Sequence, residues 1–255
     1  MRHVVKKLPQ YNYIYLGDNA RVPYGTRSPR VIHEFARQAV DFLFQNNCQL
    51  VIFACNTVSA GTLRLIQRDY IPSRYPGRNV LGIIIPAAEA AATLTKNKKV
   101  GVMATRRTVA SKAFVKELKK INRKISVHQS ACPLLVPIVE AGEHQSPATD
   151  IFLAKYLKPL LAAGIDTLVL GCTHYAVLEK KIGKISGKKI RIISEGAIVA
   201  EKLEEYLHRH PEIENHLAKN GRKIFYCTDK AARFDRLGSM ILGWKIAAQK
   251  RKLGE

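Results

Sequence analysis

The chain has 255 residues, 47% of them apolar, and its 42 Lys and Arg outnumber its 20 Asp and Glu to give a formal charge of +22. This apolar fraction suffices for a buried core and excludes an intrinsically disordered protein. No stretch approaches the roughly 18–20 continuous apolar residues of a membrane helix. Residues 1–7 also lack the apolar run of a secretory signal, so we expect no membrane contact and a cytoplasmic location.

Short apolar runs alternate along the chain with longer amphipathic segments. The runs predicted to be strands are residues 13–16, 50–54, 81–85, 100–103, 167–170, 190–193 and 224–226. Several are apolar on both faces, which is typical of a parallel sheet covered by helices. Helical spacing appears between them, for example at Val31, Phe35, Ala39, Phe42 and Leu43, and at Phe114, Val115 and Leu118. The pattern predicts an α/β fold with doubly wound parallel sheets.

Two of the five cysteines follow predicted strands in the same way. Cys55 comes after the run 50–54 and Cys172 after the run 167–170, and polar residues and helix-compatible sequence follow each. Ligands bind at such strand ends in open α/β sheets, and a helix start can lower the pKa of a thiol there. The repeated pattern predicts two similar lobes that each present one thiol to a shared cleft. Cys48, Cys132 and Cys227 are interpreted as apolar packing residues.

Two opposed thiols suit the inversion of a carbon acid. One sulfur removes a proton from one face of the carbon while the other delivers a proton to the opposite face, and cysteine can be tuned to a pKa that serves both roles. The negative charge that develops beside a carboxylate needs preorganised donors. Asn56, Thr57, Thr173 and nearby backbone amides are the candidates.

Three separated segments resemble the signatures of the glutamate racemases, which belong to the cofactor-independent Asp/Glu racemase superfamily. These are residues 17–28 (GDNARVPYGTRS), residues 54–57 (ACNT) with Ser59 and Ala60, and residues 171–175 (GCTHY). Weaker similarity joins them, at residues 132–137, 140–142 and 228–229. The resemblance implies a two-base inversion of L- and D-glutamate at Cα that supplies D-glutamate for peptidoglycan. It implies neither a metal nor a cofactor, and a small-molecule substrate as the partner; a homodimer is left open.

The resemblance also assigns roles to residues of this chain. Cys55 and Cys172 are expected to be the two acid/base residues, with His174 poising Cys172. The residues expected to bind substrate are Tyr24, Gly25, Asn56, Thr57, Thr105, Thr108, Thr173 and His174, with Asp18 and Glu140 as auxiliary acids. Without the resemblance, Glu140 would be interpreted as a solvated turn carboxylate, and residues 24–25 as an ordinary turn after Pro23.

The implied fold has two α/β lobes with the active site in the cleft between them. The first lobe is expected to be discontinuous, over residues 1–86 and 196–255, and the second to span residues 87–195. The chain would cross to the second lobe near Pro86 and return near Gly196.

Three features depart from the pattern of the family. The usual opening strand and Asp-Ser-Gly loop do not appear, and residues 1–9 look like the end of the helix that follows that loop. Either the true start lies upstream of this chain, or the first lobe lacks a strand and part of its pocket. Ala176 stands where proline is usual. Residues 194–196 are Ser-Glu-Gly in place of Asp-Ser-Gly, which adds an acid, Glu195, near the return to the first lobe.

Two alternative functions stay open at this point. One is a racemase for aspartate or another amino acid, because pocket size decides the substrate and the sequence does not reveal it. The other is a catalytically impaired binding protein that uses its basic surface. The basic residues are spread along the whole chain without a nucleic-acid-binding motif, so we do not expect nucleic acid as a partner.

Overall fold

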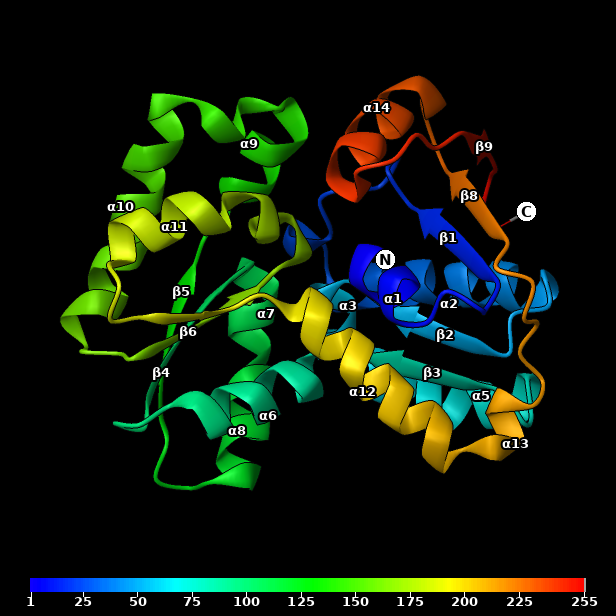
Figure 1. Ribbon diagram of the computed structural model, residues 1–255, viewed down its shortest axis with the longest axis horizontal. Helices are drawn as coiled ribbons and strands as arrows, with labels where there is room; N and C mark the ends of the chain where they lie inside the picture. The colour runs from blue at the N-terminus through cyan, green and yellow to red at the C-terminus, as the bar shows by residue number, and fades with distance from the viewer. Residues whose placement is uncertain (255) are drawn as a thin grey trace.

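The computed structural model describes residues 1–254 and consists of two α/β lobes that lie side by side (Figure 1). The strands are β1 (Tyr13–Gly17), β2 (Leu50–Phe53), β3 (Asn79–Gly82), β4 (Lys99–Ala104), β5 (Ser126–Ala131), β6 (Thr167–Gly171), β7 (Arg191–Ile193), β8 (Lys223–Cys227) and β9 (Ala248–Lys250). Every strand pair is parallel, and helices cover the sheets. The α/β fold class predicted from the sequence is confirmed.

The helices fall between the strands, as doubly wound folds require. The α-helices are α1 (Arg2–Lys7), α2 (Pro29–Gln45), α3 (Asn56–Gly61), α4 (Leu63–Leu65), α5 (Ile71–Arg74), α6 (Ile84–Leu94), α7 (Arg106–Ser111), α8 (Ala113–Ile121), α9 (Leu135–Ala141), α10 (Pro147–Ala162), α11 (Glu179–Ser186), α12 (Glu195–Arg209), α13 (Pro211–Glu214) and α14 (Ala231–Leu242). The shorter turns are η1 (Tyr24–Thr26), η2 (Ile66–Tyr70), η3 (Glu143–Gln145) and η4 (Thr173–Leu178).

Among the described residues, the first lobe shows no strand in the place that β4 occupies in the second lobe. The second-lobe sheet has the order β5-β4-β6-β7, whereas the first lobe has two separate sheets, β1-β8-β9 and β2-β3. Since cysteines follow β2 and β6, these strands correspond, and so do β1 and β5, which precede them. Among residues 1–254 no ladder joins β1 to β2, although β4 pairs with both β5 and β6. Within residues 1–254 the first lobe therefore has no strand that pairs with both β1 and β2.

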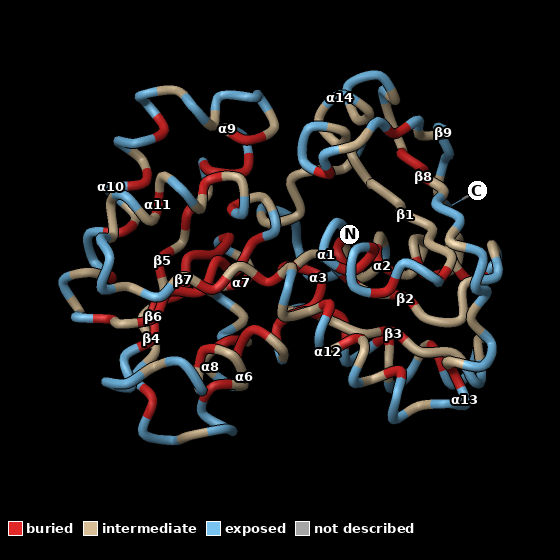
Figure 2. The backbone as a smooth tube through the Cα atoms, viewed as in Figure 1, coloured by how far each residue is buried: buried red, intermediate tan, exposed pale blue. Residues whose placement is uncertain are grey.

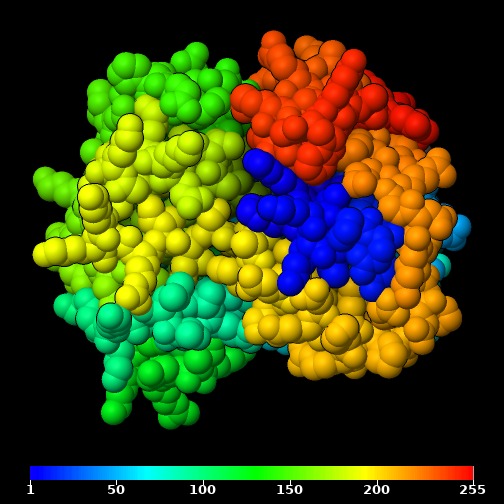
Figure 3. All heavy atoms as spheres, viewed as in Figure 1, coloured from blue at the N-terminus to red at the C-terminus, as the bar shows by residue number. Residues whose placement is uncertain are grey.

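The strands of the first lobe are also less buried than the central strands of the second-lobe sheet, because no central strand among the described residues covers their edges. β6 is buried along its whole length, while every residue of β1 is only partly buried. Figure 2 shows the buried residues concentrated on the second-lobe sheet and its covering helices. In the first lobe, α1 packs Val4 and Leu8 against Ala200 and Leu203 of α12. Figure 3 shows this N-terminal segment on the surface between α12 and the C-terminal segment.

Several sequence expectations about individual elements need correction. The run 81–85 is not one strand, because β3 ends at Gly82 and α6 begins at Ile84. Pro86 fits the first turn of that helix, where its missing N–H costs no hydrogen bond. Strands β5 and β9 were not predicted, since both lie at sheet edges and carry polar residues such as His128 and Gln129.

Helix α2 is confirmed, but its most buried stripe is shifted by one residue from the predicted one. The fully buried residues are Ile32, Ala36, Val40 and Phe44. The predicted stripe faces other partners: Phe35 stacks edge-on against Tyr24, and Phe42 against Tyr226. The helix is therefore apolar over a wider arc than one stripe.

The expected lobe boundaries fall inside helices. Residue 86 lies within α6 and residue 196 within α12. The exact division of the chain into lobes stays a prediction. Over residues 1–254, the structure contains no helix that is long and apolar enough to cross a membrane.

Candidate active site

Each of the two candidate cysteines stands between a strand and a helix. Cys55 follows β2 and caps α3, and Cys172 follows β6 and caps the 3-10 helix η4. Cys55 is half-buried and Cys172 is 7% exposed. The charge of Cys55 raises the pKa of Cys172, so the two sulfurs lie within electrostatic reach of each other. The fold thus brings together two thiols from different lobes.

Burial, rather than the helix starts, sets the protonation of these thiols in the free protein. It raises the pKa of Cys55 above the ordinary value, even though the backbone N–H groups of Val58 and Thr57 favour the thiolate. It raises the pKa of Cys172 as well, although the backbone N–H of His174 has the opposite effect. The helix-start N–H groups thus favour the thiolates, as the sequence suggests, but desolvation outweighs them and the net pKa of both thiols is raised in the free protein.

His174 links Cys172 to Glu140. Its Nδ1 atom is 4.0 Å from Cys172 Sγ, and its Nε2 atom is 2.8 Å from Glu140 Oε1. The hydrogen bond from His174 lowers the pKa of Glu140, which keeps this carboxylate ionised. Arg233 from α14 donates to the Glu140 backbone carbonyl and so ties the first lobe to this group. Glu140 is thus partnered and is not a free turn carboxylate.

Three threonine hydroxyls form a buried cluster between the lobes. Thr57 Oγ1 is 3.0 Å from Thr105 Oγ1, and Thr105 Oγ1 is 3.1 Å from Thr108 Oγ1. Thr105 caps α7 by accepting a hydrogen bond from the backbone N–H of Thr108. The cluster places second-lobe hydroxyls beside the helix that follows Cys55.

The loop of residues 17–28 is held against this threonine cluster. A Cβ atom added at Gly25 would lie 2.6 Å from Thr105 Cβ, so the loop backbone touches the second lobe. Asp18 accepts hydrogen bonds from the Tyr24 hydroxyl, from Arg21 Nε at 2.7 Å and from Thr228 Oγ1 at 2.8 Å. Asp18 therefore stabilises the loop. Burial and the charges of Asp18 and Cys55 raise the pKa of Tyr24, which places its hydroxyl near the site.

Two site features differ from the sequence expectations. Thr173 is exposed, so it is the least enclosed of the candidates. Tyr15 of β1 was not predicted, because it lies in a run that looked like plain strand. Burial and the charges of Cys55 and Glu140 raise its pKa, which locates its hydroxyl between the lobes.

Asn56 and Glu195 form a second buried link between distant parts of the chain. Asn56 Nδ2 donates to Glu195 Oε2 at 2.8 Å, and the two residues are 2% and 6% exposed. Burial raises the pKa of Glu195 to about 8. Its charge in turn raises the pKa of both cysteines, so the carboxyl group lies near both sulfurs.

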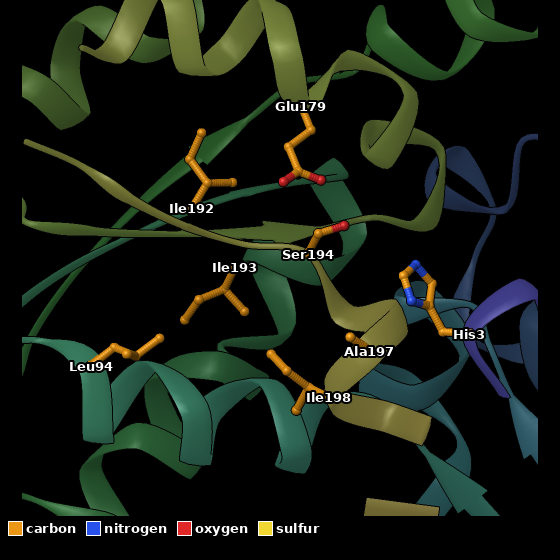
Figure 4. Close-up of a pocket in the computed structure, with 8 residues that line it drawn as sticks. All are labelled: His3, Leu94, Glu179, Ile192, Ile193, Ser194, Ala197 and Ile198. Carbon is orange, nitrogen blue, oxygen red and sulfur yellow. The ribbon is translucent and has the colours of Figure 1, made fainter. Parts of the chain in front are cut away.

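A separate hollow lies on the seam between the lobes (Figure 4). It is lined by His3, Leu94, Glu179, Ile192, Ile193, Ser194, Ala197 and Ile198. No cysteine contributes to its lining, and its walls are mostly apolar side chains. This hollow is therefore distinct from the site at Cys55 and Cys172.

Comparisons with known proteins place the chain in a family. Residues 1–203 match the Asp/Glu/Hydantoin racemase family. A glutamate racemase of Geobacter metallireducens is 37% identical over 96% of this chain and 88% of its own length. The chain belongs to the Asp/Glu/hydantoin racemase family.

Solved structures agree with this assignment. Glutamate racemase isoform RacE1 of Bacillus anthracis superposes with a TM-score of 0.89 at 33% identity, over 98% of this chain and 91% of that chain. Glutamate racemase of Francisella tularensis, solved in complex with D-glutamate, superposes with a TM-score of 0.87 at 29% identity over the same shares. The predicted enzyme class, an isomerase that racemises amino acids, is confirmed for this family member.

Proposed function

We propose that this protein interconverts L- and D-glutamate by two-base proton transfer between Cys55 and Cys172, and so supplies D-glutamate for peptidoglycan. The observation that carries the proposal is the pair of thiols at corresponding strand ends of two lobes, within electrostatic reach of each other. The similarity to glutamate racemases supports glutamate as the small-molecule substrate.

The reaction requires one thiolate and one thiol. The thiolate takes the Cα proton from one face, so that an S–H bond forms and the C–H electron pair stays on carbon beside the carboxylate. The opposite thiol then gives its proton to the other face, a new C–H bond forms, and this sulfur becomes the thiolate. The proton count is unchanged, and the reverse reaction uses the same residues in exchanged roles.

Nearby groups can supply the initial thiolate against the effect of burial. His174 Nδ1 is positioned to accept the proton of Cys172, and the Glu140 carboxylate stabilises the resulting imidazolium. At Cys55, the N–H groups of Thr57 and Val58 favour the charged sulfur and so reduce the cost of ionising it. His174 is the base for Cys172.

The remaining polar groups are proposed to hold the substrate. Asn56, Thr57 and Thr173 provide donors beside the two cysteines, and preorganised donors stabilise charge that develops next to a carboxylate. Thr105, Thr108 and the backbone at Tyr24 and Gly25 form the facing wall.

The test is to incubate the protein with D-glutamate in deuterium oxide and to follow deuterium at Cα together with formation of L-glutamate. We expect both in the wild type. C55A and C172A should each racemise glutamate at no more than about a thousandth of the wild-type rate. C48A, which alters a cysteine in the packing cluster around α2, is the matched control and should stay active. Absence of exchange in the wild type would contradict the proposal.

Aspartate turnover measured beside glutamate turnover decides between the two substrate classes. Preferred turnover of aspartate would replace glutamate as the substrate and keep the two-cysteine chemistry. A cytoplasmic location and a homodimer stay predictions.

A further inference from the structure

The buried link between Asn56 and Glu195 leaves two oxygen atoms without partners. Asn56 Nδ2 and Glu195 Oε2 satisfy each other, but within the part of the chain that the structure describes Asn56 Oδ1 and Glu195 Oε1 have no hydrogen-bond partner. Both residues are more than nine-tenths buried. A buried acceptor without a donor costs free energy, so this pair is incomplete whenever Glu195 is ionised.

The partner that completes the pair once Glu195 is ionised must be a donor with several hydrogens. Both unpartnered atoms are then oxygens that can only accept, whereas the O–H of the neutral carboxyl can still donate. An ammonium group carries three N–H donors and a positive charge that compensates a buried carboxylate. A primary ammonium therefore fits this pair in hydrogen bonding and in charge.

The position of the pair points to the substrate. Asn56 directly follows Cys55, and the charge of Glu195 acts on the thiols of both Cys55 and Cys172. An amino acid whose Cα lies between the two sulfurs carries its ammonium group one bond from that carbon. The ammonium is then close to Asn56 and Glu195.

The other acids near the site are already engaged. Asp18 is bonded to Arg21, Tyr24 and Thr228, and Glu140 to His174. Glu195 is the acid of the site with an unpartnered oxygen among the described residues.

We propose that Glu195 Oε1 and Asn56 Oδ1 bind the α-ammonium group of the substrate, an inference that rests on the proposed racemase function. Glu195 is thereby a determinant of specificity for amino acids over dicarboxylic acids that lack the amino group.

Binding of an ammonium group to the ionised Glu195 is coupled to the release of the Glu195 proton. Because burial raises the pKa of Glu195 to about 8, the free protein holds this carboxyl group mainly neutral at pH 7. The titratable groups around it are Cys55, Cys172 and His3, which lies against Gly196. An ammonium ion beside the carboxyl favours its ionised form, so glutamate binding releases the Glu195 proton to solvent.

The experiment compares glutamate with glutarate, the same dicarboxylic acid without the amino group, by calorimetry on the wild type and on E195Q. E201Q, which changes an exposed acid of the same helix, is the control. We expect E195Q to weaken glutamate binding by about tenfold or more while it leaves glutarate binding unchanged. The proposal is overturned if E195Q weakens the binding of glutamate and of glutarate equally. It is also overturned if E195Q weakens the binding of neither ligand, which would mean that a water molecule alone completes the pair.

A second measurement does not depend on the variant. Heats of glutamate binding at pH 7 in two buffers of different ionisation enthalpy should show release of about one proton by the wild type and by E201Q. Absence of release overturns the assignment to Glu195. If the wild type binds glutarate as tightly as glutamate, the assignment fails while racemase activity stands; if it neither binds nor racemises glutamate, the proposed function itself fails.

Discussion

The carboxylate of Glu140 fixes the tautomer of His174. An ionised carboxylate can only accept, so the proton of the neutral imidazole lies on Nε2 at 2.8 Å from Glu140 Oε1. Nδ1, 4.0 Å from Cys172 Sγ, is then free to accept a proton from that thiol. The arrangement suits a relay in which His174 takes the proton of Cys172 and Glu140 stabilises the imidazolium.

E140Q should slow racemisation because it removes the charge that stabilises protonated His174. We expect kcat/KM to fall by at least about tenfold. The fall must be the same for L- and D-glutamate, since the two values of kcat/KM are tied by an equilibrium constant that no variant alters. Coupled assays in both directions measure it, and E143Q, an exposed acid in the next turn, should retain wild-type rates. Unchanged kcat/KM in E140Q would remove Glu140 from the relay.

G25A should force the loop of residues 17–28 away from the second lobe. The added Cβ would lie 2.6 Å from Thr105 Cβ, a distance that requires one of the two segments to move. Overpacking of this kind costs about 1–3 kcal/mol, and here it also displaces the threonine cluster. We expect a raised KM for glutamate and a lower melting temperature. G183A, where the nearest atom would be 3.6 Å away, is the control; equal behaviour of the two variants would contradict the packing argument.

Strands that consist of a continuous apolar run can be predicted from the local sequence. The apolar runs that precede Cys55 and Cys172 become β2, which pairs with β3 alone, and β6, which lies inside the second-lobe sheet. The edge strands β1 and β7 are apolar enough to be predicted, whereas β5 is not, because polar residues interrupt it. The polar residues of β5, including His128 and Gln129, follow from its place at the edge of the second-lobe sheet.

Contacts between distant residues could not be predicted from local pattern. Asn56 and Glu195 are 139 positions apart, and nothing in either neighbourhood indicates that they meet. The same holds for Tyr15, whose place in an apolar strand hides its nearness to Cys55. The direction of the thiol pKa shifts also depends on burial by both lobes. The sequence around one strand and one helix start does not reveal how deeply distant segments will bury the thiol.

D18N should loosen the loop of residues 17–28 without changing the two cysteines. Asp18 accepts from three donors, and an amide would turn its NH2 group toward at least one of them. A lost charged hydrogen bond with an unsatisfied partner costs about 1–3 kcal/mol. We expect a lower melting temperature and a KM increase that exceeds the change in kcat. The exposed acid Asp69, paired with its neighbour Arg68, gives the control D69N; a fall in kcat alone would instead place Asp18 in the chemistry.

Glu195 should make the protein less stable as the pH rises from about 4.5 to about 8. The pKa of this carboxyl group is raised from 4.5 to about 8 in the folded protein, chiefly by burial. Between these values the folded state holds a proton that the unfolded chain has lost, so the free energy of unfolding decreases with increasing pH. The contribution of this group is fully present below pH 4.5 and is lost once the pH passes 8, by an amount on the order of several kcal/mol. E195Q cannot ionise, so its unfolding free energy minus that of the wild type should increase over this range. Urea unfolding of both proteins at pH 5, 7 and 9 measures the difference, in which the titration of all other groups largely cancels. A difference that stays constant with pH would show that the Glu195 carboxyl is ionised in the folded protein.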